Sequence, residues 1–326
     1  MTDQAKIYIG TSGWSYPKGE GTWIGYFYPP GKINELEYYS QFFNTVEINS
    51  SFYRPPNPGY VYNWVRKVPQ DFLFTVKLWQ KFTHPKMYKE STGEEAAISL
   101  QDVDIFKRSI EPLLKSNKLG ALLAQFPPSF RNDSFGQRVI TAVSRLFGQY
   151  RLAVELRHRS WSDDSNIAEL LKENNVAWVQ IDEPKFKSSI AQELPVTSDM
   201  AYFRFHGRNA ETWWTGDSET RYKYLYSAEE IEELTDRVKT TAGQTRLLFA
   251  LFNNHWRGYS PRNAVDMKKC LQLPFKELPM QVRVEEDEAS EPAEYGHIGG
   301  ISGVTHQSSL LTPKCHYFFT FCYPVL

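Results

Sequence analysis

Residues 45–51 read TVEINSS, an apolar run of strand length that ends in polar side chains capable of chemistry. The same transition occurs in seven other segments of the chain. These are KIYIGTSGW from Lys6, FLFTVKLWQK from Phe72, ALLAQFPPS from Ala121, LAVELRHRSW from Leu152, VAWVQIDEP from Val176, AYFRFHGRN from Ala201 and LLFALFNNHWRG from Leu247. Helical stretches alternate with these segments, which predicts an α/β fold: a single (β/α)8 barrel, the TIM-barrel architecture. In that architecture, ligands bind at the carboxyl ends of the strands.

Seven helical stretches complete the alternation. They cover residues 33–43, 58–68, 102–117, 134–149, 164–175, 227–243 and 261–273. Ser227, with Glu230 three residues later, predicts a capping box at the start of one helix. Nothing in the composition divides residues 1–279, which we predict to be one barrel domain. Residues 280–326 are acidic and then rich in glycine and serine, which predicts a disordered or weakly ordered tail.

Charge and composition argue against several classes of protein. The formal net charge is −1, so no global field attracts nucleic acid or a membrane surface. The three cysteines show no paired spacing, no leader precedes the first strand, and no apolar run reaches the roughly 18–20 residues of a membrane helix. We therefore expect a cytoplasmic protein without a membrane partner. The oligomeric state is open.

Alternation along the strands predicts which side chains enter the barrel. In TVEINSS, Val46 and Ile48 should meet the helices, which turns Glu47 and Asn49 inward. The same reasoning applies to the other strand ends. It places these charged candidates in one polar cluster: Glu47, Lys77, Glu155, Arg157, Asp182, Arg204 and His206. Asn253 and Asn254 close the eighth strand.

Acid/base chemistry on an anionic or sugar-like ligand is the leading interpretation of this cluster. The catalytic candidates are Glu47, Glu155, His206 and Asp182. The ligand-binding candidates are Asn49, Lys77, Arg157, Arg204, Asn253, Asn254 and Trp14, with the cations holding an anion. The reaction type, hydrolase or isomerase, is open.

Other interpretations of the same residues remain open. Glu47, Glu155, Asp182 and His206 are the ligands expected if the protein binds Mg²⁺ or Mn²⁺, although the sequence requires no cofactor. Schiff-base chemistry at Lys77 ranks last, because nearby carboxylates should keep the lysine charged. The charges are instead structural if they form an internal salt-bridge lattice that fixes the barrel.

Two aromatic loops are expected over the mouth of the barrel. Residues 10–32 contain Trp14 and Tyr16, and residues 208–227 contain Trp213, Trp214 and several tyrosines. Such rings stack on bases or sugars, or they pack on one another as a lid. Nucleic acid is accordingly a second possible partner after a small ligand.

Five blocks at the strand ends give the chain a resemblance to a known family. IGTSGWSY, TVEINSSFYRPP, AVELRHRSW, YFRFHGRN and FNNHWRGYSPRNA resemble, in order, the blocks of the YecE-like proteins, domain of unknown function family 72. The resemblance runs from about Ile7 to Leu273 and implies a TIM barrel without supplying a reaction. The family fold is similar to those of metal-dependent sugar isomerases and apurinic-site endonucleases, which is an analogy of fold alone. The sequence lacks the several inward histidines of those enzymes.

Three functions follow as expectations. The first is a TIM-barrel enzyme for an anionic or sugar-like ligand. The second is a nucleic-acid-binding protein or metal-dependent phosphodiesterase resembling apurinic-site endonucleases, and the third is a non-catalytic ligand-binding module.

Overall fold

The computed structural model describes residues 5–216 and 220–278. Within these residues nine parallel strands form one sheet, in the order β6-β5-β4-β3-β2-β1-β9-β8-β7. The strands are β1 (Lys6–Ser12), β2 (Thr45–Ile48), β3 (Leu73–Lys77), β4 (Leu119–Gln125), β5 (Leu152–Glu155), β6 (Val176–Trp178), β7 (Gln180–Asp182), β8 (Met200–Phe205) and β9 (Leu247–Phe252). Every predicted strand segment overlaps at least one of them, and the predicted α/β barrel is confirmed.

The barrel closes through one segment that is shared between two neighbours. β6 pairs with β5, whereas β7 pairs with β8. Between them, the amide of Val179 donates to the carbonyl of Val154 at 3.0 Å. The predicted sixth strand is therefore one continuous stretch of chain that joins both ends of the sheet, and this is how eight predicted segments give nine strands.

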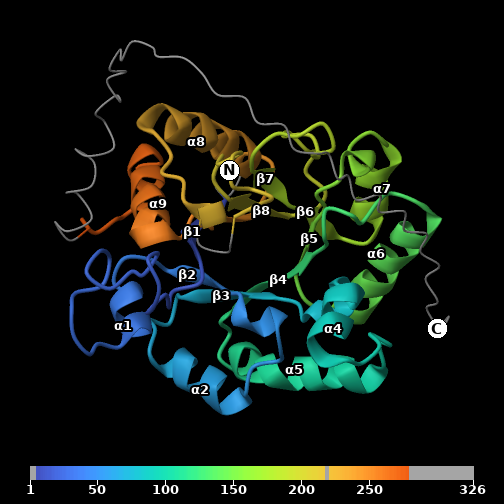
Figure 1. The fold of residues 1–326 in the computed structure, drawn as a ribbon, viewed down its shortest axis with the longest axis horizontal. Coiled ribbons are helices and arrows are strands. Elements are labelled where there is room, and N and C mark those ends of the chain that lie inside the picture. Colours follow the sequence, from blue (N-terminus) through green and yellow to red (C-terminus); the bar gives the residue numbers. More distant parts are fainter. Residues whose placement is uncertain (1–4, 217–219, 279–326) are drawn as a thin grey trace, which may run out of the picture. The chain divides into compact units, whose positions relative to one another are not determined.

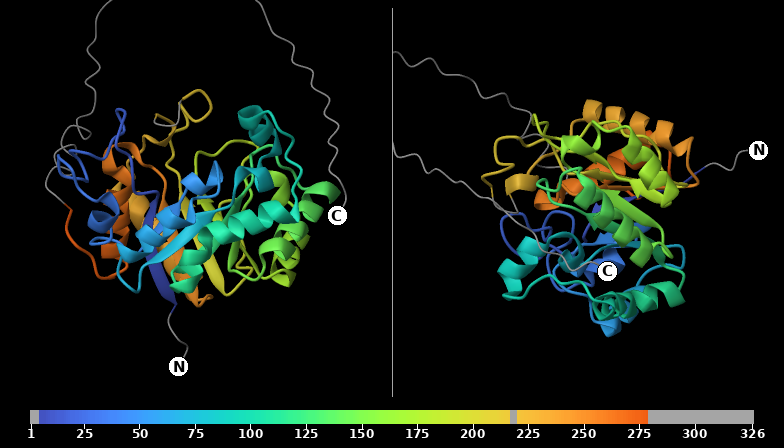
Figure 2. Two further views of the ribbon diagram at one scale, coloured as in Figure 1. Left: turned by 90° about the horizontal axis from the view of Figure 1, so that it is seen from below. Right: turned by 90° about the vertical axis from the view of Figure 1, so that its right-hand side faces the viewer.

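Helices surround the strands, as Figures 1 and 2 show from three directions. The helices are α1 (Glu35–Tyr39), α2 (Pro58–Arg66), α3 (Gln80–Thr83), α4 (Pro85–Thr92), α5 (Leu100–Lys115), α6 (Ser134–Phe147), α7 (Asn166–Glu173), α8 (Ala228–Ala242) and α9 (Tyr259–Cys270). All seven predicted helical stretches are confirmed, and so is the capping box of Ser227 and Glu230. The short helices α3 and α4, which follow β3, were not predicted. No helix lies between β7 and β8, where residues 183–199 are described, and none of the predicted helical stretches falls there.

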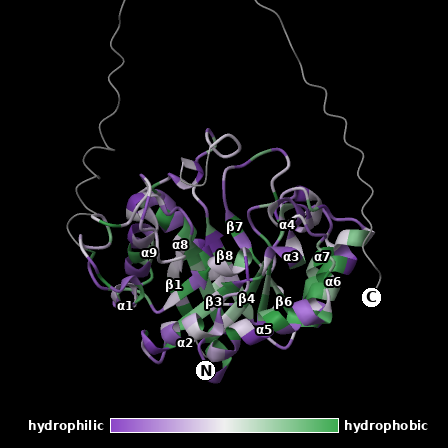
Figure 3. Ribbon diagram, turned by 60° about the horizontal axis from the view of Figure 1, so that its bottom comes forward, coloured by the Kyte–Doolittle hydropathy of each residue, from purple (hydrophilic) through white to green (hydrophobic). Residues whose placement is uncertain are grey.

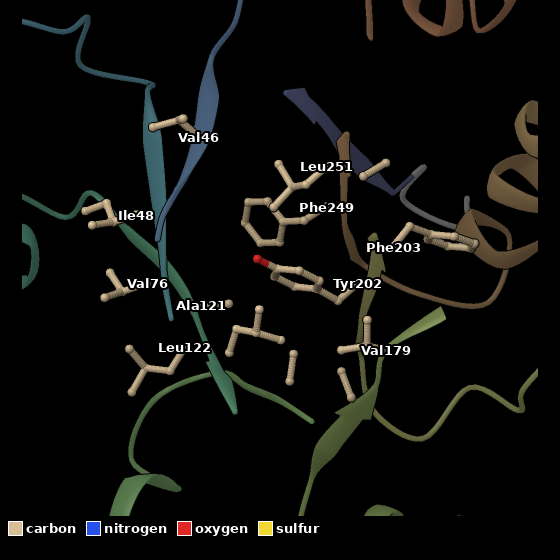
Figure 4. Close-up of a cluster of buried hydrophobic side chains, with 14 of the residues drawn as sticks. Val46, Ile48, Val76, Ala121, Leu122, Val179, Tyr202, Phe203, Phe249 and Leu251 are labelled. Atoms are coloured by element: carbon tan, nitrogen blue, oxygen red, sulfur yellow. The ribbon is translucent and has the colours of Figure 1, made fainter. Parts of the chain in front are cut away.

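Apolar side chains fill both faces of the sheet. Figure 3 shows hydrophobic residues concentrated on the strands and hydrophilic ones on the outer helix surfaces and loops. In Figure 4, Tyr202 and Phe203 on β8 point in opposite directions, Tyr202 toward Phe249. The Tyr202 hydroxyl also contacts the hydroxyl of Thr75 at 2.7 Å. The interior below the strand ends is thus a packed core, and polar chemistry is confined to the layer above it.

The described part of the chain holds no helix that is both long enough and apolar enough to cross a membrane. The predicted tail, residues 280–326, lies outside the described residues.

Candidate functional site

A single guanidinium holds two inward carboxylates at the centre of the barrel. Arg204, on β8, is bracketed by Glu47 on β2 and Glu155 on β5. Its Nη2 lies 2.7 Å from Glu47 Oε1, and its Nη1 lies 2.6 Å from Glu155 Oε2. Nε also donates to Glu47, and Nη1 donates to Gln125. All three charged side chains are at most 1% exposed, so the two acids are already matched by a buried cation.

Arg157 extends this pairing toward β7. It contacts Glu155 Oε1 at 2.6 Å through Nη2 and Glu183 Oε2 at 3.1 Å through Nη1. The result is an alternating row of charges, which we call the interior lattice: Glu47, Arg204, Glu155, Arg157 and Glu183. Burial would raise the pKa of Glu155, but Arg204 and Arg157 outweigh it and hold that pKa well below its usual range. Glu155 is therefore ionised and unsuited to donate a proton.

His206 lies beside the interior lattice as a neutral side chain. Burial, then the positive charge of Arg157, lowers the pKa of His206 to about 3. Its Nε2 is 3.1 Å from Arg157 Nη2, and its Nδ1 is 3.0 Å from the Asn253 amide. Because the Arg157 guanidinium and the Asn253 amide nitrogen both only donate, each ring nitrogen of His206 faces a donor, which fits an uncharged ring. His206 thus belongs to the network that orients Arg157.

Asp182 does not join this cluster, and the prediction that it points inward is wrong. In the β7–β8 register, Ile181 pairs with the inward Arg204, and Asp182 pairs with the outward Phe205. The Asp182 carboxylate instead accepts hydrogen bonds from Arg208 and from the Tyr226 hydroxyl, on the side of α8. The next residue, Glu183, takes the inward place. Sequence reasoning missed Glu183 because it treated residues 176–182 as one regular strand.

Two other predicted ligand-binding residues also lie elsewhere. The Asn254 amide donates to the Tyr224 carbonyl and to Asn263 Oδ1, so it fixes the loop before α8. Trp14 packs edge-on against Trp64 of α2, with ring centroids 5.2 Å apart. Both residues support the walls of the site.

A cavity of about 360 Å³ opens above the interior lattice, at the carboxyl ends of the strands. Of the predicted residues, Asn49, Lys77, Arg204 and Asn253 line it. The other lining residues are Tyr16, Gly21, Phe52, Tyr53, Gln125, Tyr222 and His255. The two aromatic loops contribute through Tyr16 and Tyr222, while Trp23, Phe27 and Tyr28 are buried against the barrel. The loops therefore both pack as a lid and supply part of the cavity wall.

Lys77 is the cation in this wall that has no carboxylate partner within the described residues. Its Nζ lies 4.0 Å from the centroid of the Phe52 ring. Its backbone is fixed where the Ser51 hydroxyl donates to the Lys77 carbonyl at 2.6 Å. Burial, together with the positive charge of Arg204, lowers the pKa of Lys77 to about 7, although the charges of Glu47 and Glu155 act in the opposite direction. A substantial share of this amine is therefore uncharged at neutral pH.

Asn49 gives the same wall an unsatisfied acceptor. Its Oδ1 is buried and has no hydrogen-bond partner among the described residues. Buried polar atoms are nearly always paired, so an orphaned amide oxygen beside a cavity favours a ligand donor at that position.

The arrangement does not fit the metal site that the sequence left open. Asp182 points to the other side of the sheet, and the Arg204 guanidinium occupies the space between the oxygens of Glu47 and Glu155. In residues 5–216 and 220–278, no three His, Cys, Asp or Glu side chains are grouped so that they could hold a metal ion.

Comparisons with known proteins agree with this architecture. The family model described as "Protein of unknown function DUF72" matches residues 8–289. The UPF0759 protein YunF of Bacillus subtilis is 31% identical over 83% of this chain and 97% of its own length. The UPF0759 protein YecE of Escherichia coli K12 is 30% identical over 47% of this chain and 48% of its own.

Two solved structures share the fold across nearly their whole length. A DUF72 family protein from Thermotoga maritima MSB8 is 36% identical, with a TM-score of 0.71, over 82% of this chain and 99% of that one. A DUF72 family protein from Enterococcus faecalis V583 is 27% identical, with a TM-score of 0.72, over 84% and 98%.

Proposed function

The chain belongs to the DUF72 family, and we propose that it is an enzyme that moves a proton on a small, sugar-like carbonyl compound, with Lys77 as the essential amine. The observation that carries this proposal is the lysine without a carboxylate partner, whose pKa is about 7, in a cavity at the carboxyl ends of the barrel strands. A group that titrates near the working pH is suited to both accept and release protons.

The cavity wall favours a ligand that carries hydroxyl groups. Asn49, Gln125 and Asn253 offer amides, and Tyr16 and Tyr222 offer rings, a combination that suits a polyhydroxylated molecule. The arginines are less suited to a strongly charged anion, because Glu47, Glu155 and Glu183 already neutralise them. Of the two expected ligand classes, sugar-like ligands are thus preferred.

The interior lattice has a supporting role in this proposal. Glu47 and Glu155 are no longer the favoured acid and base, since both are bound to Arg204. A glycoside hydrolase needs one carboxyl group that is protonated, and Glu155 is held ionised. The proposal is therefore nearer to an isomerase than to a hydrolase.

Proton exchange with deuterated water tests this proposal across a range of candidate substrates. The purified protein is incubated in D2O with a panel of aldoses, ketoses and their phosphates, and ¹H NMR follows the C–H beside each carbonyl. We expect one or a few compounds to lose this signal, and Lys77→Met to slow the loss at least about a hundredfold.

Lys18→Met is the matched control, because Lys18 is an exposed lysine in the loop after β1. It should exchange like the unaltered protein. An unchanged rate in Lys77→Met, or no exchange with any member of the panel, contradicts the proposal.

A further inference from the structure

We propose that Lys77 Nζ forms a covalent imine with the carbonyl carbon of an open-chain aldehyde or ketone bound in the cavity. The inference rests on the proposed function and states how the lysine would act there, as a nucleophile rather than as a simple base. It concerns the chemistry that the sequence alone ranked last.

The reason for that ranking does not hold in the structure. A lysine next to free carboxylates stays protonated, but Glu47 and Glu155 each contact Arg204 at 2.7 Å or less. Within residues 5–216 and 220–278, no carboxylate comes within ion-pair distance of Lys77. Glu47 and Glu155 would otherwise keep the lysine protonated, but they form ion pairs with the arginines of the interior lattice instead.

The amine is held where a carbonyl group can approach it. Lys77 is the last residue of β3, and Ser51 fixes its backbone carbonyl. It shares the wall of the 360 Å³ cavity with Asn49, Gln125 and Asn253. A bound polyhydroxylated carbonyl compound would place its hydroxyls on these amides, one of them on the unpartnered Asn49 Oδ1. Such positioning turns attack by the amine into an intramolecular step.

The reaction balances with no further reagent. The Nζ lone pair attacks the carbonyl carbon, the C=O π electrons move to oxygen, and the proton released by nitrogen neutralises that oxygen to give a carbinolamine. A second proton, the one that the lysine ammonium released to solvent when it became the free amine, then converts the carbinolamine hydroxyl into water, which leaves as the nitrogen lone pair forms the C=N bond. The product is a protonated imine, and hydrolysis by one water reverses the sequence.

The surroundings of Lys77 suit the protonated imine as well as the free amine. The Phe52 face that now lies 4.0 Å from Nζ would stabilise the positive nitrogen through a cation–π contact. The charges of Glu47 and Glu155 act in the same direction, since both favour a cation at this position. A protonated imine also acidifies the neighbouring C–H, which is the bond whose exchange the proposed function predicts.

Trapping by reduction with sodium cyanoborohydride tests directly whether Lys77 forms the imine. The protein is incubated at pH 7 with glyceraldehyde or dihydroxyacetone, sodium cyanoborohydride reduces any imine to a stable secondary amine, and mass spectrometry of the peptides locates the adduct. At pH 7 about half of an amine with a pKa near 7 is uncharged, against about one in 2,500 for an ordinary lysine. We expect Lys77 to be labelled at least about tenfold faster than any exposed lysine, and its labelling rate to level off above pH 7.

Three variants make this result specific. Lys77→Arg should abolish the preferred adduct, Lys18→Met should leave it unchanged, and Phe52→Leu should reduce its yield several-fold while the cavity volume is nearly kept. Labelling of Lys77 no faster than that of surface lysines overturns the imine.

The two proposals fail separately. Lys77-dependent hydrogen–deuterium exchange without trapping leaves the proposed enzyme in place, with Lys77 acting as a base, and removes the imine. Trapping without exchange keeps the imine and removes the proposed proton transfer.

Discussion

Arg204 shows at the scale of one residue why a charge can persist in a barrel core. Its guanidinium touches Glu47 and Glu155 and is 1% exposed. Desolvating these groups is costly, and only their mutual contacts offset the cost. Removing the cation alone would therefore leave the buried Glu47 without a cationic partner and Glu155 with Arg157 only.

We predict that Arg204→Met lowers the free energy of unfolding by about 3–5 kcal/mol. Arg159→Met is the control, because its pair with Asp163 is about half exposed and solvent screens it, so that this variant should lose far less stability. Urea denaturation of both variants at pH 7 measures the difference. Similar losses in the two variants would mean that the interior lattice contributes no more than a surface ion pair.

His206 makes stability depend on pH. Its pKa is about 3 in the folded protein against an ordinary 6.5, so the unfolded chain binds the proton first as the pH falls. The stabilisation from the neutral side chain is complete above about pH 6.5 and is lost as the pH drops toward 3, with a loss of about 2 kcal/mol by pH 5.

His206→Gln should therefore lose less stability than the unaltered protein between pH 7 and pH 5, as measured by urea denaturation. His84, whose pKa burial also lowers to about 3, is present in both proteins and cancels in the comparison. An equal loss in the two would indicate that His206 is charged in the folded state.

Alternation predicted which side chains point into the barrel wherever a strand is regular. Glu47, Glu155 and Arg204 are inward for the reason given by the sequence, namely that Val46, Val154 and Phe203 take the opposite face. Asp182 failed because the chain changes partner strands at Val179, and the paired register rather than a simple count sets the facing there. The pairing of the charges, and the lysine that it leaves without an acid, depends on distances that no single strand contains.

At the scale of elements, local signals specified most boundaries. Ser227 and Glu230 exchange hydrogen bonds at the start of α8, as their spacing predicts. α3 and α4 escaped prediction because residues 80–92 hold only Phe82, Met87 and Tyr88 as large apolar side chains, too few for a helical period to stand out.

Ser227→Ala should lower the free energy of unfolding by about 1 kcal/mol, because the amide of Glu230 loses its acceptor. Ser227→Asn keeps a capping oxygen and should cost much less. Thermal unfolding followed by circular dichroism compares the two variants. If they lose the same stability, the cap is not what holds the first turn of α8.

At the scale of the whole molecule, charge and pairing weigh against the nucleic-acid interpretation. The chain carries a formal net charge of −1, and the inward Arg157 and Arg204 are paired with Glu47, Glu155 and Glu183. Binding to a phosphate backbone depends on cations that are free to release counterions. A small uncharged ligand in the cavity does not need such unpaired cations, and for this reason we propose it as the partner.

Closure of the sheet is the property that joins these scales. The interior lattice reaches from β2 to β8 across the barrel, so its geometry requires a ring that stays shut. The ring is completed where the Val179 amide donates to the Val154 carbonyl and the chain runs from β6, which pairs with β5, into β7, which pairs with β8. A closed barrel has no edge strand from which pairing can fray.

We therefore predict that the Val179 amide exchanges with solvent as slowly as amides in β1 and β9, with an opening free energy close to that of global unfolding. Native-state hydrogen exchange read by NMR gives both values. If Val179 exchanges through a smaller opening while β1 and β9 stay protected, the ring opens at this segment, and the cavity floor would then be a movable part of the molecule.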